Sequence, residues 1–111
     1  MKICVTSPGQ SLDAPVDPRF GRCQYFVIVD SETMEYEAMP TPSIGASGGA
    51  GIQAAQTVAG KGVGVVVTGN LGPNATQTLT ASGIQMMTGA SGTVRDANFD
   101  DQFSFRHVRL N

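Results

Sequence analysis

The fold is decided by the stretch Val63-Gly64-Val65-Val66-Val67-Thr68-Gly69-Asn70-Leu71-Gly72-Pro73-Asn74. It opens with β-branched residues, which are typical of a strand buried on both faces. It then breaks at Gly69-Asn70 and reaches Pro73, a residue favoured in the first turn of a helix. We expect that helix to continue through 75–82 and to end at Gly83. The sequence therefore predicts a strand, a glycine-rich turn and a helix in succession.

This turn has a chemical consequence. In a strand–turn–helix unit, the N–H groups of the first helical turn and the positive end of the helix dipole face the space beyond the strand. An anion could be bound there, surrounded by the turn residues Gly69, Asn70, Leu71, Gly72, Pro73 and Asn74. The alternative is that the turn only connects a strand to a helix.

Length and charge limit the class of protein. The chain has 111 residues, which predicts one domain spanning 1–111 and large enough to bury a core. The net charge of −2 provides no basic surface for nucleic acid. No apolar run is long enough to span a membrane, and the chain enters a strand at once without a signal peptide. We therefore expect a cytoplasmic protein that binds neither nucleic acid nor membrane.

The most distinctive loop is Asp17-Pro18-Arg19-Phe20-Gly21-Arg22-Cys23. Two arginines and a phenylalanine flank one glycine. The planar guanidinium group is suited to oxyanions and keeps its charge at all physiological pH values. The alternative is a solvated turn in which the arginines pair with Asp13 or Asp17. Both interpretations remain open at this point.

The other elements complete an α/β pattern. Strands are expected at 24–30 and 34–39, which form an antiparallel hairpin because their connection is short. The strand of the 63–74 stretch and a strand at 84–87 flank a helix, so they should be parallel. Further segments are a first strand at 2–5, helices at 52–60 and 93–99 with Ser91 as a cap, and a last strand or extended tail within 100–111. These predict a mixed sheet of about five strands with helices packed on it.

Ligands in such sheets gather beyond the carboxyl ends of the parallel strands. Those ends lie near Thr6-Ser7, Gly69-Asn70 and Thr88-Gly89. The loop at 40–51 contains Gly48 and Gly49 and leads into a helix, which makes it a second anion-friendly element or simply a connection. We therefore add Ser7, Gly48 and Gly49 to the candidate site.

Thiolate or histidine ligation of a metal finds little support. The cysteines Cys4 and Cys23 do not form a Cys-x-x-Cys pair, and two are too few for a thiolate-held metal centre. Each is expected to be a small buried residue, with Cys23, beside the arginines, the better candidate for a site. His107 is the only histidine and is expected to be structural or solvated.

Catalytic chemistry is not indicated either. Asp13, Asp17 and Asp30 lack the spacing of a magnesium site, and no serine is paired with a visible base. We assign no catalytic residue and leave any metal ligands unassigned. The expectation is a binding protein and not an enzyme.

Three segments together resemble a known family. They are Arg19-Phe20-Gly21-Arg22-Cys23 followed by 25–30, then Gly48-Gly49-Ala50-Gly51, then Gly69-Asn70-Leu71-Gly72-Pro73-Asn74-Ala75. The chain from Met1 to about Phe99 resembles the dinitrogenase iron–molybdenum cofactor family. This family includes nitrogenase cofactor carriers and small proteins that hold a molybdenum–copper–sulfide cluster without covalent attachment.

The resemblance implies a ribonuclease-H-like α/β fold without nuclease activity and a role as a carrier of a preformed metal–sulfur cluster. Some members use a histidine that contacts the cofactor, whereas His107 lies outside the matching core. Together with the small size of the chain, this departure favours a molybdenum–copper–sulfide cluster over the iron–molybdenum cofactor or its precursor.

The leading hypothesis is a non-catalytic carrier of an anionic molybdenum–sulfur cluster held by arginines and backbone amides. Its expected site comprises Ser7, Arg19, Phe20, Gly21, Arg22, Cys23, Gly48, Gly49, Gly69, Asn70, Leu71, Gly72, Pro73 and Asn74. One alternative is an enzyme acting on a phosphate ester or nucleotide. Another is a metal-free interaction module that docks on a cofactor-assembly or cell-division protein.

Overall fold

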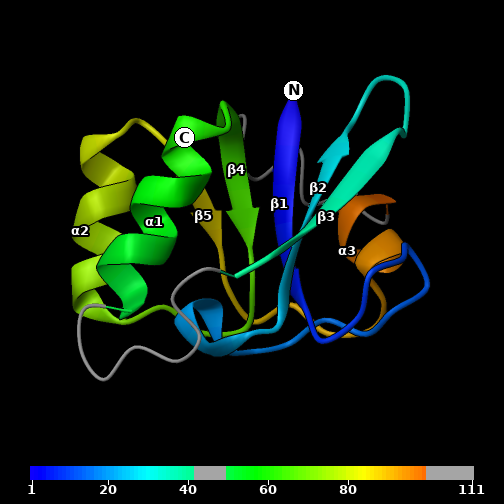
Figure 1. The fold of residues 1–111 in the computed structure, drawn as a ribbon, viewed down its shortest axis with the longest axis horizontal. Coiled ribbons are helices and arrows are strands. Elements are labelled where there is room, and N and C mark those ends of the chain that lie inside the picture. The colour runs from blue at the N-terminus through cyan, green and yellow to red at the C-terminus, as the bar shows by residue number, and fades with distance from the viewer. Residues whose placement is uncertain (42–49, 100–111) are drawn as a thin grey trace.

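The computed structural model describes residues 1–41 and 50–99 and shows a five-stranded sheet with helices on both faces (Figure 1). The strands follow the order β3-β2-β1-β4-β5 across the sheet. The expected α/β, ribonuclease-H-like mixed sheet with flanking helices is confirmed. The elements are β1 (Lys2–Ser7), the 3-10 helix η1 (Phe20–Arg22), β2 (Tyr25–Asp30), β3 (Tyr36–Pro40), α1 (Ala50–Gly60), β4 (Val63–Val67), α2 (Pro73–Ala81), β5 (Gln85–Met87) and α3 (Val94–Phe99).

Strand β1 lies at the centre of the sheet, where the chain changes from antiparallel to parallel pairing. It pairs antiparallel with β2, with Cys4 opposite Ile28, and parallel with β4, with Cys4 opposite Val66. β2 and β3 form the predicted antiparallel hairpin, and β4 and β5 form the predicted parallel pair. The β-branched run of β4 is buried because its side chains belong to the apolar clusters on both faces of the sheet.

Strands β1 and β3 differ most from their predicted bounds, whereas β2 and β5 each begin one residue later than predicted. β1 continues to Ser7 because Thr6 and Ser7 still pair with β2. β3 begins at Tyr36 and not at Met34, since Met34 has a φ of 63° and its N–H donates to the carbonyl of Asp30. This bond closes the hairpin turn and takes Met34 out of the strand.

Helix α3 is capped differently from the expectation. The hydroxyl of Thr93 accepts the N–H of Asp96 at 3.1 Å, and the Asp96 carboxylate accepts the N–H of Thr93 at 3.3 Å. This reciprocal pair is a capping box, so the assignment of Ser91 as the cap was wrong. No helix within residues 1–41 and 50–99 has both the length and the hydropathy needed to cross a membrane. The strand or tail expected within 100–111 lies outside the described residues.

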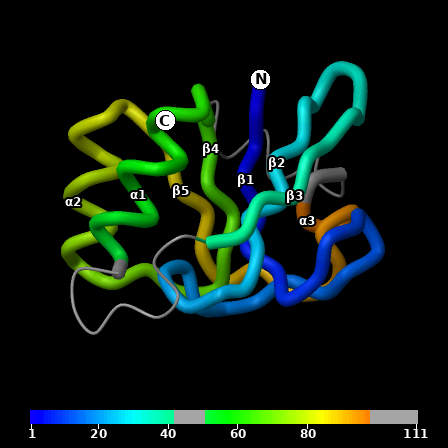
Figure 2. The backbone as a smooth tube through the Cα atoms, viewed as in Figure 1, coloured from blue at the N-terminus to red at the C-terminus, as the bar shows by residue number. Residues whose placement is uncertain are grey.

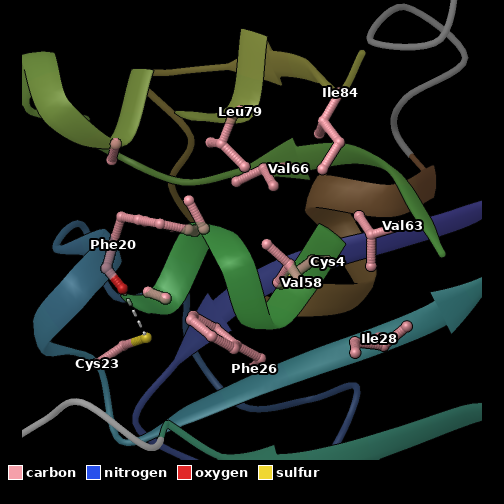
Figure 3. Packing of buried hydrophobic residues seen from close by; sticks show 13 residues of the cluster. Cys4, Phe20, Cys23, Phe26, Ile28, Val58, Val63, Val66, Leu79 and Ile84 are labelled. Atoms are coloured by element: carbon pink, nitrogen blue, oxygen red, sulfur yellow. Dashed lines mark hydrogen bonds between the residues drawn. The ribbon is translucent and has the colours of Figure 1, made fainter. Parts of the chain in front are cut away.

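The apolar side chains form one cluster on each face of the sheet. Helices α1 and α2 cover one face, where Val58 and Leu79 pack against Cys4 and Val66 (Figure 3). Helix α3 lies on the other face, where Val94 belongs to a cluster with strand residues such as Val5. Figure 1 shows α1 and α2 together on one side and α3 on the opposite side. Burying both faces holds the carboxyl ends of the strands in fixed positions.

The loops that follow the three parallel strands leave the sheet at the same edge, as the path of the backbone shows (Figure 2). The hydroxyls of Thr6 and Thr68 are 2.8 Å apart and link the ends of β1 and β4. The N–H of Thr68 donates to the carbonyl of Met87 at 3.0 Å, and that of Gly89 donates to the carbonyl of Gly69 at 2.9 Å. The expected convergence of these ends is therefore present.

The arginine-containing loop is held against this edge by its own backbone. The N–H of Asp17 donates to the carbonyl of Thr6 at 2.8 Å, and the N–H of Asn70 donates to the carbonyl of Pro18 at 2.7 Å. Gly69 approaches Pro18 so closely that a Cβ on Gly69 would lie 2.5 Å from the Pro18 Cα. Only glycine permits this contact without a shift of the backbone.

Replacing Gly69 with alanine should therefore destabilise the protein by about 1–3 kcal/mol, as over-packing does in other cores. Urea unfolding followed by circular dichroism measures the free energy of unfolding. Gly60→Ala is the matched control, because no atom lies within 4 Å of its added Cβ, and it should leave stability unchanged or slightly higher. Equal stability of the two variants would contradict the close contact with Pro18.

Candidate functional site

A cleft of about 490 Å³ opens at the carboxyl edge of the sheet. Its walls are η1, the turn between β4 and α2, and the start of α1. Figure 1 shows η1 and the beginnings of α1 and α2 gathered at this edge. The lining residues are Arg19, Phe20, Gly21, Arg22, Gly51, Asn70, Leu71, Gly72, Pro73, Asn74 and Ala75.

Most of the predicted site residues meet in this cleft. The arginine segment 19–22 forms one wall and the turn 70–74 forms the other. Ser7, Cys23 and Gly69 do not line it. Gly48 and Gly49 lie outside the described residues.

Sequence reasoning missed two lining residues, Gly51 and Ala75. A Cβ on Gly51 would lie 3.3 Å from the Cβ of Ala75, so α1 and α2 begin close together because both residues are small. A signal was available for each: Gly51 ends a glycine-rich run before a helix, and Ala75 stands in the first turn after Pro73. What the sequence could not show is that these two helix starts are neighbours.

Ser7 supports the neighbouring loop instead of facing the cleft. It is fully buried. Its hydroxyl donates to the carbonyl of Pro15 at 2.7 Å and accepts the N–H of Gly9 at 3.0 Å. Both hydrogen-bonding functions of the side chain are thus used inside the protein.

Cys23 lies beneath the wall formed by η1. Its buried thiol is 3.3 Å from the carbonyl of Phe20 and 3.4 Å from the hydroxyl of Thr41. Burial raises the pKa of Cys23 to about 11, so the thiol stays protonated at neutral pH. Burial also raises the pKa of Cys4 well above its usual value. Both cysteines are therefore buried, protonated thiols in this structure.

Phe20 anchors the arginine segment to the core. Its side chain is buried, and its ring stacks on Phe26 with 5.5 Å between the ring centroids (Figure 3). Such a pair adds to the stabilisation from burial alone. Phe20 therefore contributes an apolar part of the cleft lining and fixes the residues on either side of it.

Arg19 is paired with Asp17. This is the pairing that the sequence left open as an alternative to binding an oxyanion. The Asp17 carboxylate accepts the Arg19 Nε and Nη2 groups at 3.2 Å each, and also the Arg19 backbone N–H at 2.9 Å. Burial alone would raise the pKa of Asp17, but these hydrogen bonds outweigh it and hold that pKa below its usual value. Arg19 also lines the cleft, so the ion pair does not remove it from the site. Asp13 pairs with Arg95 instead.

The start of α2 offers backbone donors to the cleft. Gly72 precedes the helix in an extended conformation and provides no side-chain cap. Pro73 has no N–H, while the N–H groups of Asn74 and Ala75 lie in the first turn, where no intrahelical acceptor exists. These donors and the positive end of the helix dipole face the same space as the arginines.

The described lining thus combines positive charge, amide donors and apolar surface. Its polar residues include Arg19, Arg22, Asn70 and Asn74, and its apolar residues include Leu71 and Pro73. No carboxylate belongs to the described lining. Nowhere in residues 1–41 and 50–99 do three or more His, Cys, Asp or Glu side chains form a group that could hold a metal ion. Such a lining suits an anion with a partly apolar surface.

Two solved structures are similar to this chain in sequence and in fold. The apo form of the orange protein from Desulfovibrio gigas is 42% identical, with a TM-score of 0.84, and the match covers 98% of this chain and 88% of that one. A putative NifB protein from Thermotoga is 33% identical, with a TM-score of 0.77, covering 94% of this chain and 87% of that one. A search of curated proteins found no match.

The family comparison covers nearly the whole chain. The family described as dinitrogenase iron-molybdenum cofactor matches residues 1–99, which contain both walls of the cleft. This match and the similarity to the orange protein indicate a cofactor-binding, carrier-type role. The chain belongs to the dinitrogenase iron–molybdenum cofactor family.

Proposed function

We propose that this protein is a non-catalytic carrier of an anionic molybdenum–sulfur cluster, of the molybdenum–copper–sulfide type, held without covalent attachment. The observation that carries the proposal is the meeting of Arg19, Arg22 and the uncapped start of α2 around one cleft. The iron–molybdenum cofactor or a precursor is the alternative cargo, and the family name supports it.

The chemistry of such a cluster matches the cleft. A sulfide-bridged molybdenum cluster is an anion, and guanidinium groups and backbone amides stabilise anions without metal–ligand bonds. Its sulfides are soft and weakly hydrated, so contact with Leu71 and Phe20 costs little desolvation. The cleft volume of about 490 Å³ falls within the ~300–1,000 Å³ typical of small-molecule sites.

The state of the cysteines supports non-covalent binding. Cys4 and Cys23 are both buried, and burial raises the pKa of each thiol. A ligating thiolate would require either cysteine to leave the core and lose a proton. The carrier therefore holds its cargo through charge and hydrogen bonds, and no site residue is assigned as a metal ligand.

An enzyme acting on a phosphate ester or nucleotide is the second candidate, since the same donors would bind phosphate. It is less well supported because the described lining offers no carboxylate, histidine or cysteine as a general base. A metal-free module docking on a cofactor-assembly or cell-division protein is the third. In the leading proposal residues 1–111 act as one cytoplasmic domain whose ligand is the inorganic cluster, with no role for nucleic acid or membrane.

One experiment separates these candidates. Tetrathiomolybdate and copper are added to the apoprotein, and the visible spectrum is recorded after gel filtration. The proposal expects a new absorption band that elutes with the protein. No protein-bound band would contradict it, turnover of phosphate esters with Mg²⁺ would favour the enzyme, and a pull-down of partner proteins with no metal retained would favour the interaction module.

Replacing Arg19 and Arg22 together with alanine should weaken cluster retention by about tenfold or more, because hydrogen bonds to charged groups contribute roughly 1.5–3 kcal/mol. Equilibrium dialysis with molybdenum analysis measures the effect, and circular dichroism checks the fold. Arg95→Ala is the control, since Arg95 pairs with Asp13 and does not line the cleft. Unchanged retention by the double variant would remove the arginines from the site.

Asn74→Asp tests the helix start separately. A carboxylate in the first turn of α2 should stabilise the helix by about 0.3–1 kcal/mol through the dipole. It should also weaken cluster binding by roughly fivefold or more, because like charges in the cleft repel. Gln77→Glu adds the same charge to α2 away from the cleft lining and should leave binding unchanged. Equal binding by Asn74→Asp and the unmodified chain would place the anion elsewhere.

A further inference from the structure

The buried carboxylate of Asp17 pairs with Arg19, which lines the cleft. A negative charge in this position is unusual for a cleft that is proposed to bind an anion. The Asp17 side chain is only 6% exposed, whereas that of Arg19 is 66% exposed. Asp17 is not part of the cleft lining, and Arg19 is. The carboxylate therefore acts on the cleft through the guanidinium group that pairs with it.

The pair occupies one edge of the guanidinium group. Asp17 Oδ1 accepts the Arg19 Nε at 3.2 Å, and Oδ2 accepts Nη2 at 3.2 Å. A guanidinium group has five N–H donors, so this two-point pairing leaves the others to a ligand. It also cancels much of the charge that Arg19 would otherwise bring to the cleft.

Further hydrogen bonds hold Asp17 beside Arg19. Its N–H donates to the carbonyl of Thr6 at 2.8 Å, and its own carbonyl accepts the Thr6 hydroxyl. Oδ1 also accepts the N–H of Arg19 at 2.9 Å. An anion that binds Arg19 in the cleft therefore shares it with the Asp17 carboxylate.

We propose that Asp17 is a built-in counter-ion of Arg19 that limits how tightly the cleft holds an anion, which makes the cargo releasable. This inference rests on the proposed carrier function, for which release matters as much as capture. It assigns to Asp17 the role of a positioning residue that sets affinity without touching the cargo. Removing the charge of Asp17 should therefore improve anion binding. If Asp17 had only a structural role, its replacement would not improve binding.

The test is a titration of tetrathiomolybdate into the unmodified chain and into Asp17→Asn, an isosteric change whose carbonyl oxygen can still accept the Arg19 N–H. Binding by Asp17→Asn should be about tenfold tighter. Asp13→Asn is the matched control, because Asp13 also pairs with an arginine through a 3.2 Å contact but lies outside the cleft lining. Its affinity should change by less than about twofold.

The role of Arg19 is tested by repeating the change in an Arg19→Ala background. Without Arg19, water reaches Asp17 and screens its charge. The gain from Asp17→Asn should then fall below about threefold. An equal gain in both backgrounds would overturn the proposal that Asp17 acts through Arg19.

The outcomes separate this inference from the carrier function. Tetrathiomolybdate binding by the unmodified chain with equal or weaker binding by folded Asp17→Asn would overturn the counter-ion role alone. An equal gain in Asp13→Asn would also overturn it, because any lost charge would then suffice. No binding by either protein would contradict the carrier function as well. If Asp17→Asn does not fold, Asp17→Ser removes the same charge and keeps an acceptor for the Arg19 N–H, so the same expectations apply to it.

Discussion

The contact between Gly69 and Pro18 is the constraint on which the site depends. Parallel pairing of β1 with β4 brings their ends together, and the Asn70 N–H then binds the Pro18 carbonyl. Because Gly69 has no side chain, the backbone of Pro18 can lie in close contact with the turn that follows β4. Two segments about 50 residues apart in the sequence thereby become the two walls of one cleft.

This arrangement explains how a small protein with buried thiols could carry a metal–sulfur cluster. Several of its donors are positioned before an anion binds: η1 is held by the stack of Phe20 on Phe26, and the first-turn amides are held by the helix itself. Donors fixed in this way need little reorganisation when an anion binds. In the proposed carrier, which forms no covalent bond with its cargo, affinity is set by the balance of charges around the cleft. A carrier needs such a balance, because a cargo that is bound too tightly is not delivered.

Much of this structure could be predicted from sequence because local patterns decide it. The β-branched run 63–67 predicted a strand buried on both faces, Pro73 predicted the start of a helix, and the short 31–33 turn predicted a hairpin. The lining residues 19–22 and 70–74 were found because arginine, glycine and proline carry distinct chemistry.

What the sequence could not predict depends on contacts between distant segments. Ser7 was expected at the site, but the Pro15 carbonyl and the Gly9 N–H take up its hydroxyl. Cys23 is in the right loop, yet the core buries its thiol. The pairing of Asp17 with Arg19 could be suggested but not chosen from sequence, and the proximity of Gly51 to Ala75 required the packing of two helices.

The central claim is that backbone amides and guanidinium groups hold the metal cluster at the carboxyl edge of the sheet. No side chain is bonded to a metal atom of the cluster. Anomalous diffraction at the molybdenum edge from crystals of the cluster-loaded protein tests it most directly. The account predicts a molybdenum peak between Arg19, Arg22 and the start of α2, beyond bonding distance of any side chain. A peak bonded to a cysteine or histidine, or at the opposite end of the sheet, would contradict it.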